Sequence, residues 1–121
     1  MANKKTLVIG ASENSSRYSY MAIHQLRARN HDVMGLAKRV GQVADVPIQT
    51  NFPQEKNIHT VTLYIGAKHQ SEYYDAMIAL NPKRVIFNPG TENEEFKSKL
   101  LLAGMEVIEV CTFVMLSTGQ Y

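Results

Sequence analysis

The sequence has a single cysteine, Cys111, and no long apolar run. One cysteine cannot form an internal disulfide, which is typical of proteins from a reducing compartment. The apolar runs fall well short of the roughly 20 residues that a membrane-spanning helix needs. Residues 1–6 are polar and basic and lack the apolar segment of a signal peptide. We therefore expect a cytoplasmic protein without a membrane segment.

Excess charge of one sign is also missing. The formal net charge is +2, from 13 basic and 11 acidic residues that are interspersed along the chain. Surfaces that bind nucleic acid are far more basic, so we expect no nucleic-acid partner. At 121 residues, of which 45% are hydrophobic, the chain can pack one core, and two halves would be too small. The prediction is one domain over residues 1–121.

Strand patterns and helix patterns alternate along the chain. Apolar and β-branched runs predict strands at 6–10, 31–36, 60–65, 84–87 and 106–110, and residues 46–48 predict a short edge strand. Apolar residues at helical spacing predict helices with inward faces at Ala22 and Leu26, at Met77 and Leu80, and at Phe96 and Leu100. This order predicts an α/β fold, a Rossmann-like parallel sheet covered by helices on both faces.

Residue types at the helix ends predict where two of these helices begin and end. Ser16 is expected to cap the first helix, and Asn30 to end it in the left-handed conformation. The spacing of Thr91 and Glu94 is that of a capping box, which would open the last helix, and Gly104 would close it. The segment after residue 110 is mixed in polarity and predicts no regular element.

In a sheet of this kind, ligands bind outside the carboxyl ends of the strands. The first such loop starts at Gly10 and leads into a helix, whose N–H groups could bind a pyrophosphate. The dinucleotide fingerprint G-x-G-x-x-G would need glycine at positions 10, 12 and 15, whereas Ser12 and Ser15 stand at the last two. The loop therefore predicts phosphate binding that departs from the NAD pattern.

The loop after the second strand carries Lys38 and Arg39, where an NAD site has an acidic residue for the ribose hydroxyls. Two cations there favour an additional phosphate on the ribose, as in NADP and coenzyme A. The alternative is that both are solvated turn residues. Two further loops, 66–68 and 88–91, are small or rigid enough to admit a ligand, although ordinary turn chemistry explains them as well.

The run Val8–Ser12 followed by Arg17–Tyr20 resembles the small stand-alone coenzyme-A-binding proteins, which are similar to the amino-terminal domain of the succinyl-CoA synthetase α subunit. Residues 88–93 and 109–112 extend this resemblance over nearly the whole chain. It implies that loop 10–12 holds the pyrophosphate and that the loop after the second strand meets the adenosine end. The cofactor-binding residues that it implies are Gly10, Ala11, Ser12, Arg17, Lys38, Arg39, Ile65, Gly66, Asn88, Pro89 and Gly90.

By the same resemblance, Ile65, Gly66 and residues 88–90 flank the pantetheine arm. Many relatives have an Asn-Pro-Lys turn after the second strand, where this chain has residues 37–39, Ala-Lys-Arg. The role of the family lysine therefore falls to either Lys38 or Arg39.

Other chemically interesting residues have simpler explanations. Cys111 lies in an apolar stretch and is expected to be a buried structural thiol rather than a nucleophile. The four histidines lack metal-ligand spacing, so no metal site is predicted. Three glutamates between positions 92 and 95 suit the first turn of a helix, where the helix dipole favours acidic residues. No catalytic residue is predicted.

These patterns favour a module that binds coenzyme A or an acyl-CoA and has no catalytic machinery of its own. One alternative is an NADP-linked oxidoreductase, for which a single nucleotide-binding domain leaves little room for a substrate pocket and a proton donor. The other is an interaction domain with an empty nucleotide site. The expected partner is the small molecule, and no protein partner is assigned.

Overall fold

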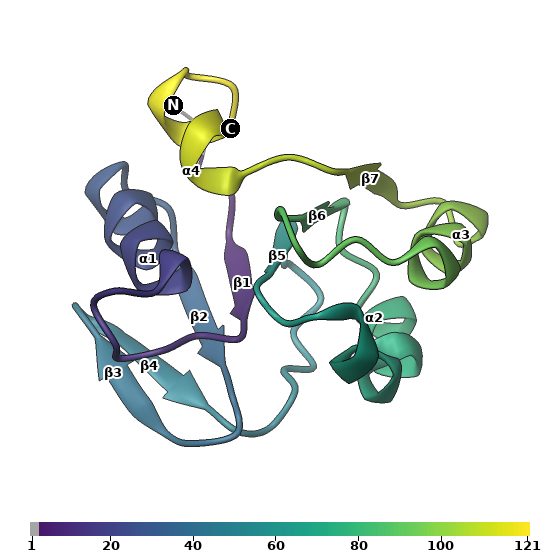
Figure 1. Cartoon of the computed structure of the whole chain (residues 1–121), viewed down its shortest axis with the longest axis horizontal. Coiled ribbons are helices and arrows are strands. Elements are labelled where there is room, and N and C mark those ends of the chain that lie inside the picture. The colour runs from purple at the N-terminus through teal and green to yellow at the C-terminus, as the bar shows by residue number, and fades with distance from the viewer. Residues whose placement is uncertain (1–2) are drawn as a thin grey trace.

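A seven-stranded sheet runs through the computed structural model, which describes residues 3–121 (Figure 1). The strands are β1 (Thr6–Ile9), β2 (Val33–Leu36), β3 (Gly41–Val43), β4 (Val46–Gln49), β5 (Thr60–Leu63), β6 (Arg84–Phe87) and β7 (Glu106–Ile108). Their order across the sheet is β3-β4-β2-β1-β5-β6-β7. All neighbours are parallel except β3 and β4. β1 is central and wholly buried, as expected for a parallel strand covered on both faces.

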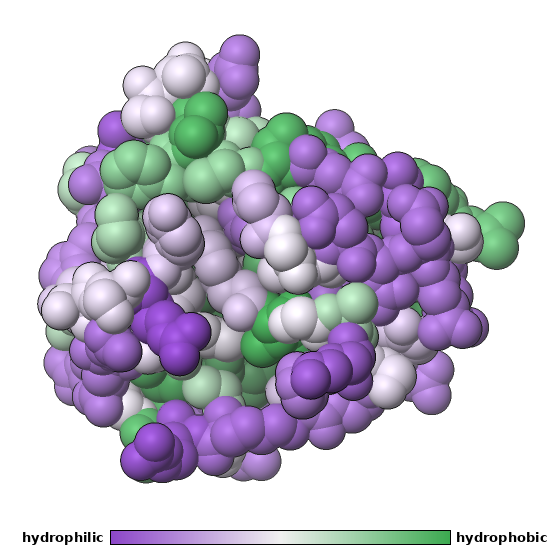
Figure 2. Space-filling view, in the orientation of Figure 1, coloured by the Kyte–Doolittle hydropathy of each residue, from purple (hydrophilic) through white to green (hydrophobic). Residues whose placement is uncertain are grey.

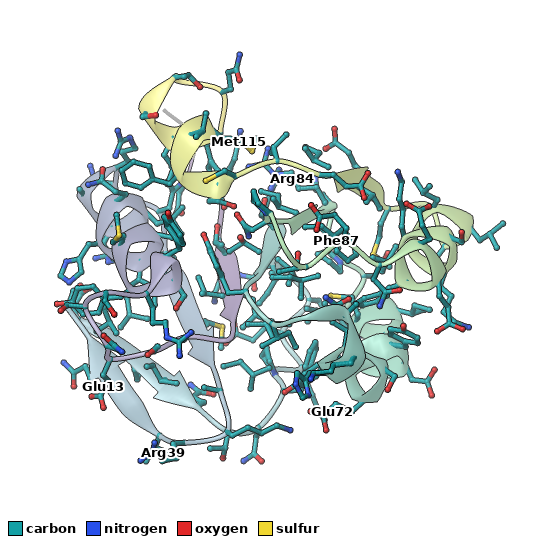
Figure 3. All side chains as sticks on the ribbon, viewed as in Figure 1. Glu13, Arg39, Glu72, Arg84, Phe87 and Met115 are labelled. Carbon is teal, nitrogen blue, oxygen red and sulfur yellow. The ribbon has the colours of Figure 1, made fainter. Side chains whose placement is uncertain are left out.

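Helices cover both faces of this sheet. One face carries α1 (Tyr18–Ala28) and α4 (Thr112–Ser117), and the other carries α2 (Tyr74–Leu80) and α3 (Glu94–Leu102). Successive strand residues point to opposite faces, so Val8 packs in the same core as Ile23, and Leu7 packs in the core of Phe96. Figure 3 shows Phe87 and Met115, one from each core. The predicted fold class is confirmed.

The first helix begins differently from the prediction. Arg17, not Ser16, is the N-cap residue of α1, and its side chain makes no capping hydrogen bond. The Ser16 hydroxyl instead donates to Asn14 Oδ1 at 2.7 Å, and the Ser16 N–H donates to the same atom at 3.0 Å. Ser16 is thus part of the tight turn that precedes the helix. At the other end, Asn30 has φ 64°, which confirms the predicted left-handed residue.

The capping-box prediction at residues 91–94 is wrong by two positions. Asn93 is the N-cap residue of α3, and its side chain accepts a hydrogen bond from the Phe96 N–H at 3.1 Å. The Thr91 hydroxyl donates to the Asn88 carbonyl at 2.8 Å and so closes the preceding turn. After the helix, Gly104 has φ 89°, as its predicted role in ending α3 requires.

Residues 46–48 form a strand as predicted, but this strand is not the edge of the sheet. β4 lies between β2 and the short strand β3, which pairs with it as a hairpin turning at Ala44, φ 54°. β3 is only three residues long, so its pattern is too short to predict. The strand that the sequence predicted at the edge of the sheet, β4, is therefore the second strand from that edge.

The carboxyl-terminal segment was predicted to form no regular element and instead forms α4. Beyond it, the chain returns to the amino end of β1, where the Tyr121 ring is buried between His31 and Arg84. The Arg84 guanidinium carbon lies 4.4 Å from the centre of that ring. None of the helices formed by residues 3–121 is long and apolar enough to cross a membrane.

Candidate functional site

The order of the strands creates a switch point beside β1. The chain passes from β1 to β2 on one side, and later to β5 on the other side, so adjacent loops leave the sheet in opposite directions. Ile9 is in register with Leu36 and Leu63, which brings the carboxyl ends of three strands together. In open α/β sheets this crevice is the usual ligand site. Two adjoining hollows open there.

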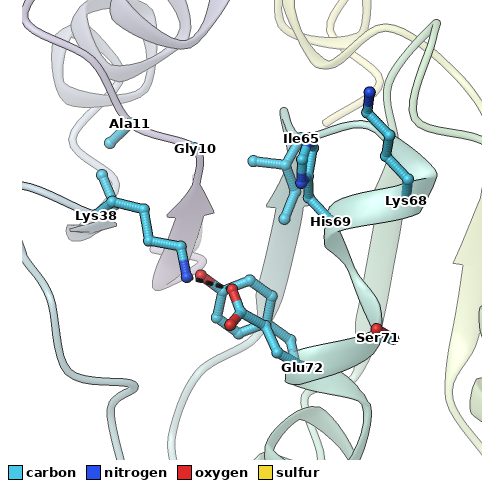
Figure 4. A pocket seen from close by; sticks show the side chains of 10 residues that line it. Gly10, Ala11, Lys38, Ile65, Lys68, His69, Ser71 and Glu72 are labelled. Carbon is cyan, nitrogen blue, oxygen red and sulfur yellow. Dashed lines mark hydrogen bonds and ion pairs between the residues drawn. The ribbon is translucent and has the colours of Figure 1, made fainter.

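The first hollow has a volume of about 570 Å³, which is within the usual range for a small-molecule pocket. Gly10 and Ala11 line it from the end of β1, Lys38 from the loop after β2, and Ile65 from the loop after β5. The Tyr73 ring closes it on the side of α2. Figure 4 shows the Lys38 side chain reaching across this space.

The second hollow has a volume of about 400 Å³ and lies between loop 11–14 and loop 37–40. Ala11 and Lys38 line both hollows, so the two are continuous. Arg39 lines only the second. A band of hydrophilic residues borders the lower edge of this face in Figure 2, and Figure 3 places Arg39 and Glu72 along that edge.

Gly10 is required by the close packing of two strand ends. It has φ 91°, and a Cβ at this position would lie 2.9 Å from Ile65 Cγ2 and 3.0 Å from the Tyr64 backbone. A side chain would therefore push the first loop away from the loop after β5. Gly10, the one glycine of the fingerprint that this sequence has, is therefore needed for the close packing of these two loops.

The loop after Gly10 presents hydrogen-bond donors without acceptors in the protein. Ser12 Oγ accepts from the Asn14 N–H at 3.0 Å, which leaves the Ser12 hydroxyl hydrogen available. Within residues 3–121, no acceptor faces the backbone N–H groups of Ser12 and Glu13, or those of residues 18–20 in the first turn of α1. A cluster of this kind, at a helix amino terminus, suits an anionic group.

Glu13 places a carboxylate in this same loop, which the sequence analysis did not consider. Its Oε2 atom accepts the Gln42 N–H at 2.9 Å and so ties the loop to β3. A Cβ on Gly41 would lie 2.7 Å from Glu13 Cδ, so glycine at position 41 makes room for the carboxylate. Gly41 was the available signal in the sequence, and the sequence analysis did not use it.

The two cations of the second loop differ in their surroundings. Lys38 Nζ forms an ion pair with Glu72 and lies 5.6 Å from the centre of the Tyr73 ring. The hydrogen bond from Lys38 lowers the pKa of the Glu72 carboxyl group. Arg39 has no ion-pair partner in the part of the chain that the structure describes. Arg39 is therefore available to a ligand, and so is Lys68, which lines the first hollow and also has no ion-pair partner among residues 3–121.

The remaining predicted site residues do not line either hollow: they are Arg17, Gly66, Asn88, Pro89 and Gly90. The first of these is exposed at the start of α1, and the Asn88 side chain is buried and bonded inside the protein. A Cβ at Gly66 or Gly90 would meet no atom within 4 Å, so the backbone at both glycines borders open space. Gly66 follows Ile65, which lines the first hollow, and Gly90 lies in the loop after β6, the neighbour of β5 in the sheet.

Gln70 is a site-supporting residue that the sequence gave no reason to select. It is fully buried, and its amide nitrogen donates to the Ile65 carbonyl at 2.9 Å and to the Thr91 carbonyl at 2.8 Å. Its oxygen accepts from the Asn93 side chain at 3.0 Å. Gln70 thus joins the loop after β5 to the loop after β6.

Cys111 is only partly buried, so the prediction of a buried thiol was too strong. It is the N-cap residue of α4 and makes no side-chain capping hydrogen bond. Among residues 3–121, no group of three or more histidine, cysteine or acidic side chains could hold a metal ion.

Comparison with known proteins shows the family of this chain and relatives with the same fold. The family model described as "CoA binding domain" matches residues 4–117. A crystal structure of an uncharacterized protein is 41% identical, with a TM-score of 0.95 and complete coverage of both chains. None of the curated proteins matches significantly.

Two more distant structures share the fold. A hypothetical protein from Pyrococcus horikoshii OT3 is 24% identical over 96% of this chain and 83% of its own, with a TM-score of 0.86. An oxidoreductase from Bacillus cereus is 19% identical over 86% of this chain and 33% of its own, with a TM-score of 0.60.

Proposed function

The chain belongs to the CoA-binding domain family, and we propose that it binds coenzyme A or an acyl-CoA across the two hollows at the switch point. The observation that carries this proposal is the cluster of unused donors around Ser12 and the first turn of α1. Ser12 lines the second hollow together with a cation, Arg39, and that hollow is continuous with the first, which has a volume of about 570 Å³. Phosphate donors, a cation and a pocket for a flat ring are what a nucleotide with an additional ribose phosphate needs.

Each part of the cofactor has a suitable place in this arrangement. The pyrophosphate would accept hydrogen bonds from the Ser12 hydroxyl and the N–H groups around it. The ribose phosphate would lie in the second hollow near Lys38 and Arg39, which both line it, and the adenine ring in the first, against Tyr73. The pantetheine arm would run over the open backbone at Gly66 and Gly90.

We assign no catalytic step to the chain. His69 and Ser71 line the first hollow, but in residues 3–121 neither side chain donates or accepts a hydrogen bond. A nucleophile activated by a neighbouring base would need such a contact. On this proposal, the chain binds coenzyme A or an acyl-CoA without a chemical step and acts as a carrier or a sensor of acyl-CoA.

An NADP-linked oxidoreductase is the second candidate, because NADP also carries a phosphate on the adenosine ribose. The structural likeness to an oxidoreductase is at 19% identity and supports the shared fold alone. An interaction domain with an empty site is the third. The cytoplasmic location that the single cysteine suggests stays a prediction.

Calorimetric titration with coenzyme A, dephospho-coenzyme A, NADP and NAD separates these functions. We expect coenzyme A to bind most tightly. The double variant Lys38→Ala, Arg39→Ala should weaken coenzyme A by about tenfold or more, since charge-assisted hydrogen bonds contribute roughly 1.5–3 kcal/mol. Dephospho-coenzyme A should lose little.

The variant Lys83→Ala changes a cation at the opposite, amino-terminal edge of the sheet and is the matched control. It should bind all four ligands as the wild type does. Tight binding of NADP alone would put the oxidoreductase first. Binding of none of the four would favour the interaction domain.

A further inference from the structure

A carboxylate at the site of a polyanion needs an explanation. Glu72 lines the first hollow, from the short helical turn Ser71–Tyr73, and its side chain is half exposed. Coenzyme A carries several negative charges, so a fixed carboxylate beside its binding site opposes binding. The proposed function alone gives no reason for an acidic residue here.

The Glu72 carboxylate pairs with Lys38, a cation that the proposed ligand would also use. The Lys38 ammonium group donates to Glu72 Oε1 across the first hollow, as the dashed line in Figure 4 shows. The two residues come from loops on opposite sides of the switch point, one after β2 and one before α2. The ion pair therefore spans the hollow where the proposed ligand would enter.

This ion pair is easily opened. The Lys38 side chain is 77% exposed and that of Glu72 is 51% exposed, so water screens their attraction. The other carboxylate of the site differs, because Glu13 is held by the backbone N–H of Gln42. An anionic group of the ligand can therefore replace Glu72 as the partner of Lys38 without moving the backbone.

We propose that Glu72 is a built-in competitor for the ligand's phosphate: its carboxylate occupies Lys38 in the empty protein and gives it up on binding. This inference rests on the proposed function. A ligand that brings a phosphate to Lys38 replaces one anion by another with a higher charge. A ligand without that phosphate offers Lys38 no anion in exchange for Glu72, so Glu72 affects the affinity for the phosphorylated ribose most.

The test is Glu72→Gln, which keeps the size of the side chain and removes its charge. Exposed ion pairs contribute about 0.2–1 kcal/mol, so the Kd for coenzyme A should fall by a factor of about 1.4 to 5. The Kd for dephospho-coenzyme A should change by less. In the Lys38→Ala background the gain should shrink by at least half, because no ion pair remains to be released.

Glu55→Gln is the matched control, because Glu55 also forms an exposed ion pair with a lysine, Lys5, away from both hollows. It should leave the Kd unchanged. If Glu72→Gln weakens coenzyme A, Glu72 positions Lys38 for the ligand and the competitor role is wrong. An unchanged Kd also overturns it, while coenzyme A binding itself stands. If neither folded protein binds coenzyme A, the proposed function fails as well.

Discussion

The side-chain oxygen of Asn88 accepts a hydrogen bond of 2.8 Å from the backbone N–H of Thr112, the first residue of α4. The amide nitrogen of Asn88 donates to Thr62 Oγ1 at 2.7 Å and to the Leu63 carbonyl at 2.8 Å. Asn88 is 3% exposed. One buried amide therefore joins β5, β6 and α4. A ligand near this loop would meet the backbone of its neighbours rather than the Asn88 side chain.

Asn88→Ala should destabilise the fold. It leaves the Leu63 carbonyl and the Thr112 N–H without their buried partner, and each such loss costs about 1–3 kcal/mol. We expect urea unfolding to show a free energy of unfolding lower by about 3 kcal/mol. Asn57→Ala, at an exposed asparagine, is the control and should change it little. A loss at Asn88 no larger than at Asn57 would contradict the structural role.

The sequence predicted the parts of the molecule that depend on local pattern. Five parallel strands were visible as apolar or β-branched runs, of which β1, β5 and β6 are wholly buried. Asn30 and Gly104 were visible because their conformation favours those residue types. The carboxyl ends of parallel strands meet at one edge of the sheet, so the sequence also predicted that Gly10, Lys38 and Arg39 lie near one another.

Side-chain direction could not be predicted where it depends on distant partners. Asn88 turns inward because α4 presents an N–H to it, and the tail that forms α4 has no long periodic pattern. Gln70 is buried because two carbonyl groups from different loops meet its amide. The Lys38 and Glu72 pair joins residues 34 positions apart, which no local pattern reveals.

Cys111→Ser should leave the fold stable or slightly more stable. The residue is half-buried at the N-cap of α4, where a serine oxygen can accept a backbone N–H that the thiol leaves unbonded. We expect the free energy of unfolding to change by between zero and about +1 kcal/mol. Binding of coenzyme A should be unaffected. A loss of more than about 1 kcal/mol would show that the thiol packs as a core residue.

His31 should make stability depend on pH. Burial, with help from the nearby Lys4 and Arg84 charges, lowers the pKa of His31 below its usual 6.5. Below pH 6.5 the unfolded chain therefore binds a proton at His31 more readily than the folded protein does. The stabilisation is complete above pH 6.5 and is lost as the pH falls from there toward the lower folded pKa. Urea unfolding between pH 7.5 and 5, in steps of about half a unit, measures this slope.

His31→Asn is the variant that tests this, since Asn Oδ1 can replace the ring nitrogen that accepts the Lys4 N–H at 3.0 Å. It should reduce the slope, and the remainder belongs to His59, because burial lowers the pKa of His59 as well. His24→Asn, at an exposed position on α1, should leave the slope as it is in the wild type. Equal slopes in the wild type and His31→Asn would mean that His31 does not resist protonation.

Ser12→Asp should abolish ligand binding and leave the fold intact. An aspartate oxygen can still accept the Asn14 N–H, as Ser12 Oγ does, so the loop keeps its turn. Its charge would face the ligand's pyrophosphate at close range, and we expect at least a tenfold loss of affinity. Ser98→Asp, on the exposed side of α3, adds the same charge elsewhere. If Ser12→Asp bound coenzyme A as tightly as the wild type does, the pyrophosphate would not lie on this loop.

The most direct test of the central proposal is an NMR titration of the isotope-labelled protein with coenzyme A, followed at each backbone amide. The account predicts saturable shifts at residues 10–13, 37–40 and 65–73, which surround the two hollows. It predicts shifts also at residues 18–20 and 88–90, where the proposal places the phosphates and the pantetheine arm, and little change along β7 and α3. Shifts centred on the opposite edge of the sheet around Lys83, or none at millimolar coenzyme A, would contradict it.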